Sequence, residues 1–150
     1  MIRKPLWVLV GIALVAGAVG CARSDQGAEK GVAGNGKEEQ AIAAAEVWLE
    51  MVDAGDYSES WEASAELFRK VVSREQWVQS LLGVRAPLGK LVSRELASKQ
   101  YATELPGAPD GEYVIIQFAT SFENKKTAVE TITPMLAPGG SWKVSGYFIK

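Results

Sequence analysis

Two side chains in this sequence stand out for the chemistry that they could carry. Cys21 is the single cysteine, and it lies between an apolar run and the polar stretch ARSDQG. Its thiol is a nucleophile and an attachment point for a modifying group. Glu130 lies in the largely apolar stretch TAVETITPML, and burial among apolar neighbours raises the pKa of a carboxyl group toward neutrality. Such a group can act as a general acid or base, and Tyr101, Tyr113 and Tyr147 could supply hydroxyl groups beside it.

The composition excludes several kinds of catalytic and metal site. The sequence contains no histidine, which excludes the familiar serine triads, cysteine–histidine pairs and histidine-ligated zinc sites. A single cysteine cannot form an intramolecular disulfide. Asp53 and Asp56 do not follow the spacing of an EF-hand, so we expect neither metal nor cofactor. The formal charge of −2 becomes −4 once the two charges of Arg3 and Lys4 are subtracted, which argues against a nucleic-acid partner.

Charged residues also gather at a predicted turn. The segment Glu123, Asn124, Lys125 and Lys126 follows a strand-like run, and asparagine tolerates the backbone of a tight turn. Charges at a hairpin tip are explained by solvation, and a partner-binding tip is the alternative. Other basic residues are interleaved with glutamates, so we expect them to be solvated. These are Arg69, Lys70, Arg74, Arg85, Lys90 and Arg94.

The first twenty residues have the plan of a secretory signal. Arg3 and Lys4 precede an apolar run from residue 6 to about residue 19, and the small residues Ala18 and Gly20 stand just before Cys21. The competing interpretation is a retained membrane helix, because residues 5–22 carry no charge and lie at the lower limit for spanning a bilayer. The small residues before the cysteine favour cleavage.

The sequence AVGC with its basic start resembles the lipobox of bacterial lipoproteins. The resemblance implies cleavage before Cys21, attachment of diacylglycerol to its sulfur and acylation of the new amine. One departure is Ala18, where leucine is more usual. Ala22, rather than aspartate, follows the cysteine; by analogy with Gram-negative lipoproteins, this implies an outer-membrane location facing the periplasm. We therefore expect residues 1–20 to be a signal peptide and residues 21–37 to be the lipidated cysteine and a flexible tether.

The sequence of the remaining residues, 38–150, predicts one globular domain that begins with three helices. Apolar residues from Ala41 to Val52 follow helical spacing, and Gly55 is a natural stop. A second helix runs from a cap at Asp56 through Phe68, and a third opens at Ser73 with a capping box. Trp48, Trp61, Trp77, Val78, Leu81 and Leu82 are expected to face the core, although a tryptophan could instead line a ligand cavity.

Four strand-like stretches follow: LVSRELASKQYATEL, EYVIIQFATSF, TAVETITPML and SWKVSGYFIK. Both faces of the second are largely apolar, so we expect a central strand that is covered on both sides. Pro134 indicates an edge or a bulge in the third. Three helices followed by a four-stranded antiparallel sheet make an α+β domain.

This arrangement resembles the NTF2-like and cystatin-like architecture, in which a curved sheet wraps helices and can leave a conical pocket. The strings DAGDYSESW, FRKVVSREQW and LPGAPDGEYVIIQFATSFENKK are also similar to a bacterial family known as domain of unknown function 4019. The likeness covers roughly residues 40–150, and the family carries no assigned activity.

We therefore expect a lipoprotein that is attached to the membrane through its lipid and serves as a binding or assembly module for an envelope protein partner. The absence of histidine and of a spare thiol argues against an enzyme. Two alternatives remain open at this stage. One is a receptor for a small apolar or amphipathic ligand in a pocket between sheet and helices. The other is an enzyme that works through a carboxylate and a tyrosine, with Glu130 as the residue to test.

Overall fold

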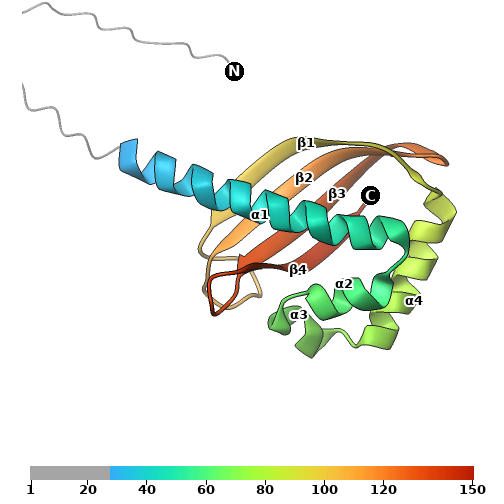
Figure 1. Cartoon of the computed structure of the whole chain (residues 1–150), viewed down its shortest axis with the longest axis horizontal. Helices are drawn as coiled ribbons and strands as arrows, with labels where there is room; N and C mark the ends of the chain where they lie inside the picture. Colours follow the sequence, from blue (N-terminus) through green and yellow to red (C-terminus); the bar gives the residue numbers. More distant parts are fainter. Residues whose placement is uncertain (1–27) are drawn as a thin grey trace, which may run out of the picture.

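The computed structural model describes residues 28–150, which form helices followed by one antiparallel sheet (Figure 1). The α+β class predicted from the sequence is confirmed. The predicted signal peptide, Cys21 and the first part of the tether lie outside the described residues.

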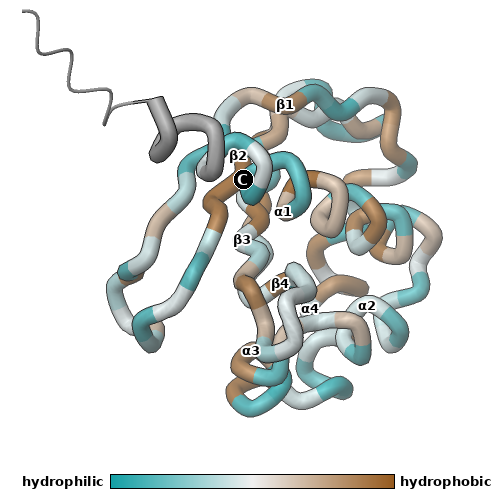
Figure 2. Tube along the Cα trace, turned by 60° about the vertical axis from the view of Figure 1, so that its left-hand side comes forward, coloured by the Kyte–Doolittle hydropathy of each residue, from teal (hydrophilic) through white to brown (hydrophobic). Residues whose placement is uncertain are grey.

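Helix α1, Ala28–Ala54, lies across one face of the sheet (Figure 1). The flexible coil predicted up to Lys37 is wrong for residues 28–37, because α1 already includes them. Lys37 pairs with Glu112, and Glu38 lies 3.4 Å from the Nζ of Lys99, so the sheet holds this part of the helix. Of the predicted apolar stripe, Ala41, Ala45, Trp48, Leu49 and Val52 are buried and Ile42 is half-buried. Hydrophobic and hydrophilic positions alternate around the turns of α1 (Figure 2). The predicted stop at Gly55 is confirmed, and its φ of +87° suits glycine.

The second predicted helix is divided into α2, Tyr57–Ala63, and α3, Glu66–Val71. Ser64 and Ala65 between them are extended, and the Ala65 N–H donates a 2.7 Å hydrogen bond to the Val144 carbonyl on the sheet edge. The predicted Asp56 cap is wrong, because its side chain makes no capping hydrogen bond. The break was not predicted, because it depends on this contact with a strand far along the chain.

Helix α4, Arg74–Arg85, begins with the predicted capping box. The Gln76 N–H donates to Ser73 Oγ at 3.2 Å, and the Ser73 N–H donates to Gln76 Oε1 at 3.0 Å. Trp77 and Leu81 are buried as predicted, whereas Leu82 is 47% exposed. A short 3₁₀ turn, Ala86–Leu88, then leads into the sheet.

The sheet has the order β1-β2-β3-β4, and every neighbouring pair is antiparallel. Its strands are β1, Leu91–Ala102; β2, Tyr113–Phe122; β3, Lys125–Leu136; and β4, Trp142–Ile149. The register with β4 shifts between Thr133 and Pro134, which confirms the predicted bulge. Proline cannot donate a ladder hydrogen bond, and a bulge accommodates that loss.

Strand β2 is central, but it is fully covered on one face only. Val114, Ile116 and Phe118 are buried beneath the helices. On the opposite face Ile115 is half-buried and Ala119 is exposed. The prediction that both faces are covered is therefore wrong, because the helices lie on one side of this sheet.

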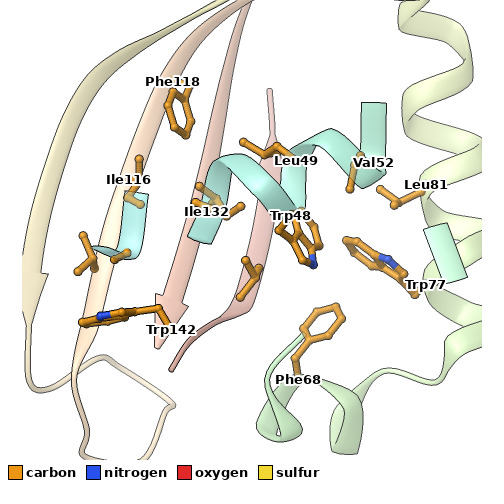
Figure 3. Close-up of a cluster of buried hydrophobic side chains, with 14 residues drawn as sticks. Trp48, Leu49, Val52, Phe68, Trp77, Leu81, Ile116, Phe118, Ile132 and Trp142 are labelled. Atoms are coloured by element: carbon orange, nitrogen blue, oxygen red, sulfur yellow. The ribbon is translucent and has the colours of Figure 1, made fainter. Parts of the chain in front are cut away.

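An aromatic cluster fills one part of the space between helices and sheet (Figure 3). It consists of Trp48, Phe68 and Trp77, which Figure 3 labels, together with Tyr147, which packs against them. The ring centroids of Trp48 and Trp77 are 5.8 Å apart, and Phe68 meets Trp77 edge-on at 5.1 Å. Both indole N–H groups donate to Ser60: Trp48 to its carbonyl at 2.7 Å and Trp77 to its hydroxyl at 3.0 Å. The cluster therefore joins α1, α2, α3, α4 and β4 without a buried indole donor left unpaired within it.

Candidate functional site

Glu130 lies on the buried face of β3, and its side chain is fully inaccessible to solvent. Two hydroxyl groups from neighbouring strands donate to its carboxylate. Thr120 Oγ1 on β2 donates to Oε2 at 2.7 Å, and Tyr147 Oη on β4 donates to Oε1 at 2.6 Å. Both donors belong to strands that β3 pairs with, so the sheet itself fixes this part of the site.

Arg94, on the edge strand β1, links Glu130 to Asp53 at the end of α1. Its Nε lies 2.7 Å from Glu130 Oε2, and its Nη2 lies 3.2 Å from Oε1. The same guanidinium donates from Nη1 to Asp53 Oδ2 at 2.7 Å and from Nη2 to Oδ1 at 3.0 Å. One planar cation thus holds two carboxylates by paired hydrogen bonds, the geometry for which arginine is suited and lysine is not.

Arg85, the last residue of α4, completes the site. Its Nη2 donates to Asp53 Oδ1 at 2.5 Å, and its Nη1 lies 3.5 Å from Glu130 Oε1. The guanidinium also lies 4.5 Å from the ring centroid of Phe122, which gives a cation–π contact. We call Asp53, Arg85, Arg94 and Glu130 the ion network. Its two cations and two anions balance, as a buried group of charges requires.

The protonation states follow from these contacts. Burial on its own raises the pKa of Glu130, but hydrogen bonds from Arg94 and Tyr147 outweigh it and lower the pKa below its usual range. Burial and the neighbouring Glu130 charge raise the pKa of Tyr147. The carboxyl is therefore ionised at neutral pH and the phenol is protonated. The raised pKa expected for Glu130 from the sequence is wrong, because Arg94 of β1 and the Tyr147 hydroxyl of β4 reach its carboxylate.

Arg85 and Arg94 were expected to be solvated, and this expectation is wrong. The side chain of Arg85 is 5% exposed and that of Arg94 is 12% exposed. A signal for Arg85 exists in the sequence, since it follows Trp77 and Leu81 at intervals of four residues and so lies on the same buried stripe of the helix. No local pattern marks Arg94, whose burial depends on α1 and β3.

The predicted hairpin tip has a structural role in two of its four residues. Glu123 and Asn124 form the turn between β2 and β3, and Phe122 pairs with Lys125. Glu123 Oε2 accepts a hydrogen bond from the Lys90 N–H at 2.9 Å, and Asn124 Nδ2 donates to the Pro87 carbonyl at 3.1 Å. The tip therefore holds the segment between α4 and β1. Lys125 and Lys126 are exposed, and partner binding by them stays a prediction.

Of the three tyrosines considered with Glu130, only Tyr147 reaches it. Tyr101 Oη donates to Glu112 at 2.8 Å, and Tyr113 Oη donates to the Pro109 carbonyl at 2.7 Å. Cys21 lies outside the described residues. Within residues 28–150 no cluster of three or more potential metal ligands occurs, and no helix has the length and apolarity needed to cross a bilayer.

Two hollows lie at the surface of the described residues, away from Glu130. An apolar groove of about 390 Å³ lies between α1 and β4, and a hollow of about 360 Å³ lies between α3 and the β3–β4 loop. We call them the α1–β4 groove and the α3–β4 hollow. Glu130 lines neither of them. Glu130 is thus enclosed by its neighbours, and these two hollows lie elsewhere on the described residues.

A family model described as "Protein of unknown function (DUF4019)" matches residues 44–147. This chain belongs to the DUF4019 family. The match confirms the family expected from the sequence, and the DUF4019 region includes the whole ion network and the aromatic cluster. The search of curated proteins and the search of solved structures gave no match. The likeness to NTF2-like domains and the lipoprotein assignment stay predictions.

Proposed function

We propose that this DUF4019 protein is a lipid-anchored binding or assembly module of the bacterial cell envelope. The observation that carries the proposal is the saturation of Glu130. Two arginines and two hydroxyl groups surround its carboxylate, which is fully buried and ionised. A carboxylate in this state holds elements together and has no open position for a substrate proton. We therefore infer that the domain acts by binding a partner at its surface.

The anchor rests on the lipobox-like sequence that ends at Cys21. Two or three acyl chains together hold a protein firmly at a membrane, whereas one does so only marginally. Ala22 favours the outer membrane, with the domain facing the periplasm. Since α1 begins at Ala28, the six residues 22–27 separate the cysteine from the first helix, and their fully extended length is at most about 20 Å. The domain would therefore work close to the membrane surface.

The two alternatives drawn from the sequence have weaker support. A receptor pocket between sheet and helices would need the space that the aromatic cluster and the ion network fill. An enzyme built on Glu130 would need a carboxyl that exchanges a proton near neutral pH, whereas the pKa of this one is lowered. That the protein is not an enzyme stays a prediction.

The anchor is tested by changing Cys21 to Ser in the full-length protein. We expect the variant to lose labelling by radioactive palmitate and to accumulate unprocessed, because the acceptor sulfur is gone. Equal labelling of the variant and the wild type would refute the anchor. Ala22→Asp is the matched variant for location: it should retain the label but fractionate with the inner membrane.

The binding role is tested by crosslinking in living cells, followed by mass spectrometry of the purified adducts. A reproducible envelope protein at stoichiometric yield supports the module. Recovery of abundant bystanders only, in proportion to their cellular abundance, would contradict it. Cys21→Ser serves as a control here too, since a specific complex at the membrane should decline when the anchor is lost.

A further inference from the structure

The α1–β4 groove has an apolar lining with a small-residue wall. Ala43, Ala44, Val47 and Met51 of α1 form one side, and Trp142 and Val144 of β4 form the other. Val47 is 55% exposed, although it is a large apolar residue next to the core. Alanines on a helix allow another backbone to approach closely, so the groove suits the apolar side of a second helix.

The α3–β4 hollow continues this surface with positive charge. Arg69, Lys70 and Lys143 line it, and Lys143 also lines the groove. Lys70 forms an ion pair with Glu66, with Nζ 2.8 Å from Oε1, and Arg69 Nη1 lies 3.9 Å from Glu62 Oε2. Within the described residues Lys143 makes no ion pair, and the Arg69 Nε is buried without an acceptor. This end of the surface therefore favours carboxylates.

Addition of a strand to β4 is obstructed at this point. The α2–α3 connection lies against the edge of β4, where the Ala65 N–H donates a hydrogen bond to the Val144 carbonyl. That carbonyl is therefore not free to pair with an added strand. A partner would therefore bind through side chains in the groove rather than by extending the sheet. Trp142 at the wall of the groove also has an indole N–H that is buried and unpaired within residues 28–150.

From these contacts we propose that the α1–β4 groove and the α3–β4 hollow together bind an amphipathic helical segment of an envelope protein. Its apolar stripe lies along Val47 and Met51, and its acidic flank faces Lys143. Glu46 and Glu50 are exposed on the solvent side of α1 beyond Val47, so the opposite flank of the segment is basic or neutral. This inference rests on the proposed function and adds to it a surface and a partner chemistry.

The test uses the full-length anchored protein with the photo-reactive residue p-benzoylphenylalanine at position 47, in cells. We expect a covalent adduct with one envelope protein, and the crosslinked peptide should carry aspartate or glutamate beside an apolar stripe. The same residue at position 82 is the matched control, because Leu82 is a similarly exposed apolar side chain on α4. Its adduct yield should be at least tenfold lower.

Charge is then reversed on both sides of the contact. Lys143→Glu should reduce the adduct yield at position 47 at least fivefold, whereas Lys126→Glu, on the distant hairpin, should leave it unchanged. A synthetic copy of the crosslinked segment, measured by fluorescence anisotropy, should bind the wild type more tightly than Lys143→Glu. A copy with its acidic residues changed to lysine should reverse that preference. Unchanged thermal unfolding of both variants excludes misfolding as the cause.

The outcomes separate this inference from the proposed function. Adducts at position 82 but not at position 47 overturn the inference and leave the binding module standing. An adduct with lipid at position 47 also overturns it, since the surface would then contact the membrane. If Lys143→Glu leaves the adduct yield at position 47 unchanged, the proposal that the partner is acidic is overturned. Absence of adducts at both positions, together with failure of general crosslinking, overturns both proposals.

Discussion

The space between helices and sheet has two ends with opposite chemistry. At one end the aromatic cluster excludes water with large rings, and at the other the ion network brings four charges into the interior. The same helices supply both: α1 carries Trp48 and Asp53, and α4 carries Trp77 and Arg85. Tyr147 joins the two ends, because its ring lies 5.4 Å from Trp48 while its hydroxyl donates to Glu130.

The two ends stabilise the fold in different ways. Aromatic burial contributes free energy in proportion to the apolar area removed from water, and it tolerates small shifts. A buried ion network gains little net free energy, because desolvation offsets the attraction, but it demands exact partners. The ion network contacts α1, α4 and all four strands, so we infer that it fixes how the layers meet.

The largest expected effect comes from removing one charge of the ion network. Glu130→Met keeps the side-chain volume but leaves Arg85 and Arg94 with Asp53 alone. We expect a loss of about 3–5 kcal/mol in the free energy of unfolding, measured by urea denaturation. Glu95→Met, on the exposed side of β1, is the control and should change stability by less than about 0.5 kcal/mol.

The double variant Arg94→Met/Glu130→Met tests whether Arg94 and Glu130 are energetically coupled. It removes one cation and one anion together and leaves Asp53 paired with Arg85. We expect it to be more stable than the sum of the single variants indicates, by about 1–3 kcal/mol. Additive single effects would mean that Arg94 and Glu130 are not energetically coupled, contrary to their 2.7 Å contact.

At the aromatic end a smaller loss is expected. Trp77→Phe removes part of the ring and the hydrogen bond to Ser60 Oγ, but a phenyl group still fills most of the space. We expect a cost of about 2 kcal/mol from the lost area and the lost hydrogen bond together. The denaturation midpoint of this variant should not depend on salt or on acid differently from the wild type. A changed pH dependence would contradict the separation of the two ends.

Of the two ends, we expect acid to weaken the charged one. The pKa of Glu130 in the folded protein lies below its ordinary 4.5, so the stability that its charge supplies is complete above that value. It is lost as the pH falls from about 4.5 through the folded pKa. Glu130→Gln should therefore lose less stability than the wild type on that acid side. Urea denaturation at pH 6, 5, 4 and 3.5 measures the difference, and parallel curves would count against it.

The smallest expected effect concerns α4, which serves both ends. Ser73→Ala removes one half of the capping box and should cost about 1 kcal/mol. Asp56→Ala before α2 is the matched comparison, because Asp56 makes no capping hydrogen bond and its removal should change stability by a few tenths of a kcal/mol. Equal losses for the two variants would show that the difference in cap geometry has no energetic consequence.

Local patterns in the sequence predicted most elements of the fold, because helices, caps and bulges depend on residues that are close together in the chain. Helical spacing predicted the stripe of α1, the Ser73 capping box predicted the start of α4, and Pro134 predicted the bulge in β3. The break between α2 and α3 could not be predicted in this way, since it follows from the hydrogen bond between Ala65 and Val144, which are 79 positions apart in the chain.

The candidate site was only half predictable for the same reason. Glu130 was recognised as a carboxylate in apolar surroundings, and its burial is complete. The sign of its pKa shift was wrong, because the groups that reverse it, Arg94 above all and then the Tyr147 hydroxyl, come from the other strands β1 and β4. A carboxylate that is buried with an arginine and one that is buried alone look the same in one sequence, and they differ completely in chemistry.

Helix α1 is held by ion pairs at two places along its length, and this has a mechanical consequence. Lys37 and Glu38 connect its first part to Glu112 and Lys99, and Asp53 connects its last turn to two arginines. A pull on the N-terminal side that is directed along the helix axis would load these bonds in shear. Bonds in shear share a force and break together rather than one after another. The proposed anchor would thus act on the domain through α1, a helix that contacts all four strands and so resists being peeled from the sheet.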